Sequence, residues 1–194
     1  MDYPASVHLT RLVATIAVFT ALIVGSNLAL SNFLDLKLDA ALIFMTTIVF
    51  GAYAGASVAV LSETIWSLVS PWGASGAYLL PFLVSAELLY VVAGLIARRT
   101  LRGRWDAARG SSALFAGLLG IFTFIWDVWT NLGWALLTTT LSLGPILVVE
   151  FNPGALAFNV THEVSNLILG ATFVPATLVL LPKVARGFLR DAVE

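Results

Sequence analysis

The 194-residue sequence contains no cysteine and few charged side chains. Without cysteine, disulfide scaffolds, thiolate nucleophiles and cysteine metal sites are excluded together. Charged residues make up 11% of the chain, whereas an ordinary soluble domain carries about 25%. Hydrophobic residues make up 59%, which leaves too little polar surface for a soluble globule. The composition predicts an integral membrane protein.

Several functional motifs are also missing. The formal net charge is -1 and no large basic surface is present, which excludes nucleic acid as a partner. The G-x-x-x-x-G-K-[ST] loop of an ATPase does not occur. The zincin motif and the nucleophile elbow are absent too, and His162 with Glu163 does not by itself make a metal shell. The sequence therefore predicts no catalytic residue, no metal and no cofactor.

The hydrophobic runs predict a single all-α membrane domain over residues 1–194, built as a bundle of six transmembrane helices. A helix that crosses the roughly 30 Å hydrocarbon core needs about 20 apolar residues, and fewer where polar residues face a protein interior. Small residues in FGAYAGAS separate the short second and third runs, and they suit a tight turn or a close helix contact. The predicted spans are residues 9–30, 38–53, 57–69, 78–97, 111–136 and 154–181.

The basic residues predict the orientation of the spans, because lysine and arginine accumulate in short cytoplasmic loops. With six spans, almost all of them fall on one side of the membrane, and only Lys37 falls on the other. Both termini are therefore expected in the cytoplasm, and the connections at residues 31–37, 70–77 and 138–153 outside. The residues on the cytoplasmic side are Arg11, Arg98, Arg99, Arg102, Arg104, Arg109, Lys183, Arg186 and Arg190.

The acidic residues Glu63, Glu87, Asp127 and Glu163 lie away from the ends of the predicted spans, without a lysine or arginine at a similar depth to pair with them. Ionisable residues are unfavourable in a bilayer and usually face a bundle interior or a cavity. A rise of about 1.5 Å per residue places Asp127 roughly 24 Å beyond Ser111, in the outward half of the membrane. Glu87 lies nearer the middle of its span, and two interpretations stay open for it: a protonated structural acid and a contact to a ligand.

Polar side chains of three spans converge in this outward half, which predicts a substrate site beneath the outer connections. In the sixth span they form one stripe at i, i+3, i+4 and i+7, beginning at Asn159. Asparagines here are also suited to hydrogen bonds between helices, and tryptophans to the aromatic belt at the membrane surface. The predicted substrate-binding residues are Glu63, Trp66, Trp72, Asp127, Asn131, His162, Glu163 and Asn166.

Three stretches of the chain carry a family resemblance. The first span contains ATIAVFTALIVG, in which Ala17 and Ala21 form an A-x-x-x-A pattern that Ala14 extends. ETIWSLVSPWGAS is followed by LLPFLVSAELLYVVAGLIARR, and WDVWTNLGWALL is followed by FNVTHEVSNLILGATFVP. In order and topology these segments resemble the substrate-binding S components of energy-coupling factor (ECF) vitamin transporters, which are six-span proteins of about this length.

The resemblance implies a mechanism and partners. An S component is not an enzyme; it captures a vitamin outside the plasma membrane and tips in the bilayer to release it inside. The small face formed by Ala14, Ala17 and Ala21 would dock onto a transmembrane coupling subunit, which two cytoplasmic ATPases power. The nickel and cobalt branch of the family has a metal-binding histidine near the amino terminus. Here position 2 is Asp2 and the first histidine is His8, which disfavours that branch.

The acidic residues suggest a cationic substrate, because carboxylates crowded in one poorly solvated cavity need protons or a cation to relieve their repulsion. A ring with a basic or quaternary nitrogen, stacked on tryptophan and held by Glu63, Asp127 or Glu163, fits this requirement. Thiamin or its pyrimidine precursor is the expected ligand. Cobalamin is the alternative, with His162 as a conceivable cobalt ligand. An intramembrane enzyme acting on a lipid, or a structural scaffold, are alternatives of other classes.

Overall fold

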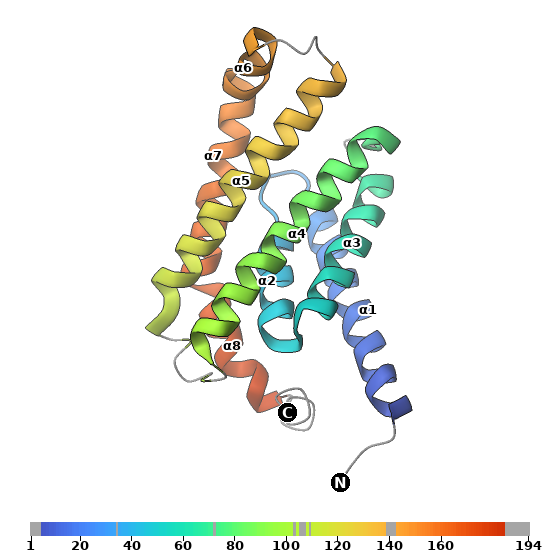
Figure 1. Cartoon of the computed structure of the whole chain (residues 1–194), viewed down its shortest axis with the longest axis vertical. Helices are drawn as coiled ribbons and strands as arrows, with labels where there is room; N and C mark the ends of the chain where they lie inside the picture. The colour runs from blue at the N-terminus through green and yellow to red at the C-terminus, as the bar shows by residue number, and fades with distance from the viewer. Residues whose placement is uncertain are drawn as a thin grey trace.

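The computed structural model describes residues 5–33, 35–71, 73–102, 104, 108, 110–138 and 143–184. All regular secondary structure within these ranges is helical, as the sequence predicts (Figure 1). The helices are α1 (Ala5–Leu30), α2 (Asp39–Phe50), α3 (Ala52–Val69), α4 (Gly76–Leu101), α5 (Ser112–Thr138), α6 (Leu143–Phe151), α7 (Pro153–Ala171) and α8 (Phe173–Val184).

Five helical segments are long and apolar enough to cross a membrane, as in a multi-pass membrane protein. They lie in α1, α3, α4, α5 and the stretch Pro153–Leu180, which combines α7 with most of α8. The predicted second span corresponds to α2, which is apolar but has only 12 residues. A helix of that length rises about 18 Å, which is less than the thickness of the hydrocarbon core.

Helix α2 is the centre of the bundle. Every residue from Asp39 to Val49 is buried, and the helix is apolar on all sides, as expected of a helix with no face toward water or lipid. Helices α3 and α4 approach it closely at Gly55 and Gly94, which both lie against Thr47. A Cβ atom at Gly94 would be 2.9 Å from the carbonyl oxygen of Phe44, so this contact requires glycine.

The chain turns from α2 into α3 at Gly51, whose φ of +92° is rarely adopted by residues with a side chain. The break thus falls inside the predicted second span, and α3 begins at Ala52 rather than at Ser57. Arg98 of α4 donates hydrogen bonds to the carbonyl oxygens of Ile48 and Val49, at 3.1 and 3.4 Å. A guanidinium at this end satisfies carbonyl groups that have no partner within the helix.

The region expected to be the last outer connection contains helix α6, and the predicted sixth span is interrupted. Asn152 caps α7, because its side-chain oxygen accepts hydrogen bonds from the amides of Gly154 and Ala155, both at 3.0 Å. Between α7 and α8 the helix breaks at Thr172, three residues before Pro175. Proline has no amide hydrogen to continue the helical pattern, and its ring crowds the preceding turn.

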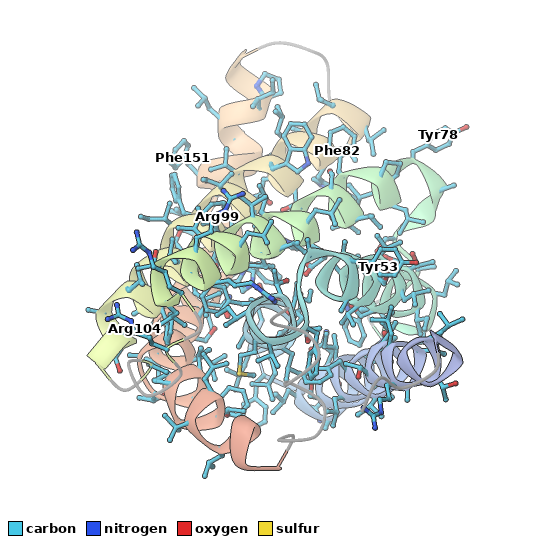
Figure 2. All side chains as sticks on the ribbon, turned by 60° about the horizontal axis from the view of Figure 1, so that its bottom comes forward. Tyr53, Tyr78, Phe82, Arg99, Arg104 and Phe151 are labelled. Atoms are coloured by element: carbon cyan, nitrogen blue, oxygen red, sulfur yellow. The ribbon has the colours of Figure 1, made fainter. Side chains whose placement is uncertain are left out.

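Arginines gather at one end of the bundle. The beginning of α1, the α2–α3 turn, the end of α4 and the end of α8 lie together at this end (Figure 1). Arg99 and Arg104 lie at that end of the α4 region, whereas Tyr78 lies at the opposite end of α4 (Figure 2). Of the predicted cytoplasmic residues, Arg109, Arg186 and Arg190 lie outside the described residues.

Candidate functional site

The connection between α1 and α2 enters the bundle instead of lying on its surface (Figure 1). Asp35 and Lys37, which belong to this connection, are both buried, and Asp35 has no exposed surface at all. Asp35 has a φ of +46°, a left-handed conformation that aspartate tolerates better than most residues. The connection therefore brings two charged side chains into the protein interior.

Lys37 and Asp35 form an ion pair, with 2.8 Å between Nζ and Oδ1. Burial by itself lowers the pKa of the Lys37 ammonium, but the nearby charges of Asp35 and Asp39 outweigh burial and raise this pKa above the ordinary lysine value. The ammonium also lies 5.6 Å from the ring centre of Trp126 and 5.9 Å from that of Phe158. Both distances allow cation–π attraction. Lys37 is thus a cation held by carboxylates and aromatic rings.

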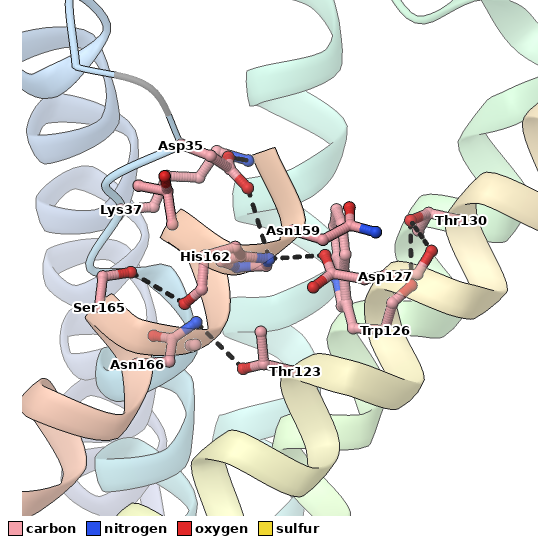
Figure 3. Close-up of polar contacts among 12 residues, drawn as sticks. Asp35, Lys37, Thr123, Trp126, Asp127, Thr130, Asn159, His162, Ser165 and Asn166 are labelled. Carbon is pink, nitrogen blue, oxygen red and sulfur yellow. Dashed lines mark hydrogen bonds and ion pairs between the residues drawn. The ribbon is translucent and has the colours of Figure 1, made fainter. Parts of the chain in front are cut away.

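His162 of α7 lies between two carboxylates (Figure 3). Its Nδ1 atom is 2.8 Å from Oδ1 of Asp127 on α5 and 3.4 Å from Oδ2 of Asp35. His162 and Asp127 are each only 2% exposed. The ring of Trp126 contacts the imidazole edge to face, with 5.0 Å between ring centres. Three separate segments therefore meet at one imidazole nitrogen.

Further acidic side chains surround this group. Asp39, at the start of α2, accepts a hydrogen bond from Nδ2 of Asn27 at 3.2 Å. Glu63 of α3 accepts one from the hydroxyl of Ser67 at 2.9 Å. Glu87 of α4 accepts one from Nε1 of Trp126, also at 2.9 Å. Each acid keeps a polar partner, as buried carboxyl groups require.

Buried acids outnumber buried cations at this site. The buried ionisable side chains among the described residues of the site comprise five carboxyl groups, one ammonium and one imidazole. Opposite charges cannot balance five ionised carboxylates here, so protons or a bound cation have to make up the difference. The carboxyl groups are those of Asp35, Asp39, Glu63, Glu87 and Asp127, and the cationic groups those of Lys37 and His162.

Hydrogen bonds between α5 and α7 frame the site. Asn166 donates through Nδ2 to the hydroxyl of Thr123 at 3.0 Å (Figure 3). Asn131 donates through Nδ2 to Oδ1 of Asn159 at 3.4 Å. Asn131 and Asn166 therefore each form a hydrogen bond between helices, which is the role that the sequence left open for them.

The structure brings together only some of the predicted site residues. Asp127 and His162 are in direct contact, and Glu63 and Trp66 are buried on α3. Glu163 follows His162 but remains partly exposed. Trp72 lies outside the described residues. The three predicted docking alanines, Ala14, Ala17 and Ala21, are exposed along α1.

Sequence reasoning missed Asp35, Lys37 and Asp39 as members of the site. The signal was present as three charges within five residues, DLKLD, which lead into the first turn of the fully buried stretch of α2. A short charged stretch between two hydrophobic runs favours a water-facing connection, and Lys37 was accordingly assigned to the outer surface. Only the contacts with α5 and α7 reveal that the stretch is buried.

The fold and the site define a multi-pass helical membrane protein with an ionic centre inside its helix bundle. No protein-family model, no curated protein and no solved structure matches the chain at the significance required.

Proposed function

We propose that the protein is the substrate-capture subunit of an ECF-type ABC importer, and that it binds a small cationic nitrogen heterocycle such as thiamin or its pyrimidine. The observation that carries this proposal is the excess of buried carboxyl groups around an ammonium held by two aromatic rings. The same chemistry suits a cationic ring: carboxylates supply charge-assisted hydrogen bonds, and tryptophan supplies a face for the cation.

In the proposed arrangement, the chain crosses the plasma membrane six times, and both termini lie in the cytoplasm. Helix α2, which the neighbouring helices enclose, makes the second crossing. In support, the described arginines of the α4–α5 region lie at the same end as the beginning of α1. In this orientation Asp127 lies roughly 22 Å from the start of α5, in the outward half of the bundle.

The proposed partners are a transmembrane coupling subunit and two cytoplasmic ATPases. The supporting feature is the outer face of α1, where Ala14, Ala17 and Ala21 are exposed and leave room for a second helix to approach closely. A groove of about 370 Å³ borders this face and is lined by Ala14, Val18 and Phe50, among other residues.

Ligand binding is tested by isothermal titration calorimetry on purified, chelator-treated protein, with thiamin, its pyrimidine and cobalamin as separate ligands. Asp127→Asn is expected to weaken binding of a cationic ring by about 10- to 100-fold, because a hydrogen bond to a charged group contributes roughly 1.5–3 kcal/mol. The control is Thr161→Ala, since the Thr161 hydroxyl donates to the Ala157 carbonyl of its own helix.

Three outcomes would contradict the proposal. Tight binding of cobalamin without any response to the cationic rings would replace the ligand class. Turnover of a bound lipid would favour the enzyme alternative. Absence of any saturable small ligand would favour a structural scaffold. Mass spectrometry of molecules that co-purify with the protein provides an independent identification of the ligand.

A further inference from the structure

We propose that Asp35, Asp127 and His162 form a binding site for a divalent transition-metal ion, with Zn²⁺ as the best fit. This inference does not rest on the proposed import function. Metal binding by the purified protein, without any partner, is enough to test the site.

The spacing of the three side chains matches a shared metal ion. One ligand atom from each of Asp35, Asp127 and His162 can be chosen so that all lie within 4.8 Å of one another. The imidazole nitrogen Nδ1 lies 2.8 Å from one carboxylate and 3.4 Å from the other. Two ligand atoms that are each about 2.0–2.2 Å from a tetrahedral zinc ion lie roughly 3.3–3.6 Å apart. Small movements of the side chains therefore suffice to form the site.

Hydrogen bonding within the group is incomplete. The Nδ1 atom of His162 carries at most one proton, which cannot serve two carboxylates at once. Oδ1 of Asp35 pairs with the Lys37 ammonium at 2.8 Å, but Oδ2 has no hydrogen-bond partner among the described residues and faces the imidazole at 3.4 Å. Oδ2 of Asp127 has no hydrogen-bond partner either. Buried polar atoms are nearly always paired, so these oxygens point to a ligand that contacts both acids.

The donor set determines the kind of metal. One imidazole nitrogen and two carboxylate oxygens suit zinc, and three protein ligands leave one tetrahedral position open for water or another ligand. Two carboxylates also balance the charge of a divalent ion. Glu163, which the sequence places beside His162, is not part of this set.

Lys37 competes with a metal ion for Asp35, because its ammonium is the cation that now pairs with this carboxylate. Metal binding would exchange one cation for another at Asp35. The carboxylates of Asp39 and Glu63 also attract the Lys37 ammonium, so opposite charges stay near it when it leaves Asp35. The excess of buried acids thus lets a metal ion enter without leaving Lys37 unpaired.

The test is a Co²⁺ titration of the full-length protein, purified without a histidine tag and treated with chelator. Cobalt replaces zinc in such sites and reports its coordination through visible absorption. Wild-type protein is expected to bind one Co²⁺ saturably, with a tetrahedral spectrum that Zn²⁺ abolishes. Loss of an outer-shell partner alone weakens metal sites by roughly 10- to 100-fold, so Asp35→Asn and His162→Gln are each expected to weaken Co²⁺ binding at least about 10-fold.

His8→Gln is the matched control, because His8 and His162 are the two histidines of the chain. This variant is expected to bind Co²⁺ like wild type, and Lys37→Met to bind it several-fold more tightly. Melting temperatures measured in chelator show whether each variant is folded. The wild-type titration tests the site even if a variant does not fold. Failure of wild type to bind saturably overturns the proposal, as do equal affinities in wild type, Asp35→Asn and His162→Gln. Binding of organic cations by metal-free protein tests the import function separately.

Discussion

Replacing Lys37 by methionine tests whether the ionic centre stabilises the fold. The substitution keeps the length of the side chain but removes the ammonium that lies 2.8 Å from Asp35. Asp35 has no exposed surface, so its carboxylate would remain in the protein interior without its nearest cation. Breaking a buried ion pair on one side destabilises a protein by about 3–5 kcal/mol. For a chain of this size, each kcal/mol lowers the melting temperature by roughly 2–4 °C, which predicts a loss of about 6–20 °C.

The assay is thermal unfolding in detergent, followed by intrinsic tryptophan fluorescence. A double-mutant cycle with Asp35→Asn separates the pair from its surroundings. The double variant Lys37→Met/Asp35→Asn is expected to recover at least half of the loss, because it removes the unpaired charge together with its partner. A Lys37→Met variant that melts within about 2 °C of wild type would falsify the claim that this pair is buried in the folded protein.

Three further predictions concern other parts of the molecule. Between pH 7 and about 10, the difference in melting temperature between wild type and Lys37→Met should stay constant, because the pKa of Lys37 is raised in the folded protein. Its stabilisation is complete below the ordinary lysine pKa of about 10.4 and is lost as pH rises from there through the raised value. A difference in melting temperature that already shrinks between pH 7 and 9 would contradict the ion pair. Gly94→Ala should destabilise the protein by about 1–3 kcal/mol in thermal unfolding, because its Cβ would lie 2.7 Å from that of Thr47, whereas Gly117→Ala, with open space around it, should not. Ala17→Trp and Ala21→Trp should abolish co-purification with the coupling module yet leave the melting temperature unchanged, because both alanines are exposed; unchanged association would refute the docking face.

The all-helical fold and part of the site follow from local sequence patterns. Long apolar runs identify the helices that are able to cross a membrane, since their composition alone separates them from water-facing segments. Asp127 and His162 stand out because a charged or polar residue in such a run needs a partner inside the protein. Their contact at 2.8 Å agrees with that argument.

Other features depend on contacts between distant segments, which periodicity does not encode. DLKLD has the composition of a surface connection, and only its pairing with α5 and α7 makes burial favourable. Helix α2 is shorter than the run that predicts it, because Gly51 ends it. The break at Thr172 has a local signal in Pro175, but proline is also tolerated within membrane helices, so its presence alone did not predict the interruption.

The shortness of α2 explains how the ionic centre forms. Neighbouring helices enclose α2, and its first turn begins at Asp39, which lies below the upper ends of α3 and α5 in Figure 1. The chain leaving α1 must descend into the bundle to reach this point, and the descent carries Asp35 and Lys37 alongside His162. Asp127 and His162 belong to helices that are joined by other hydrogen bonds, through Asn166 and Thr123 for example. Asp35 and Lys37 meet that pair through charge and aromatic contacts. A cation that competes for Asp35 would therefore act first on the connection, while the α5–α7 half of the site stays in place.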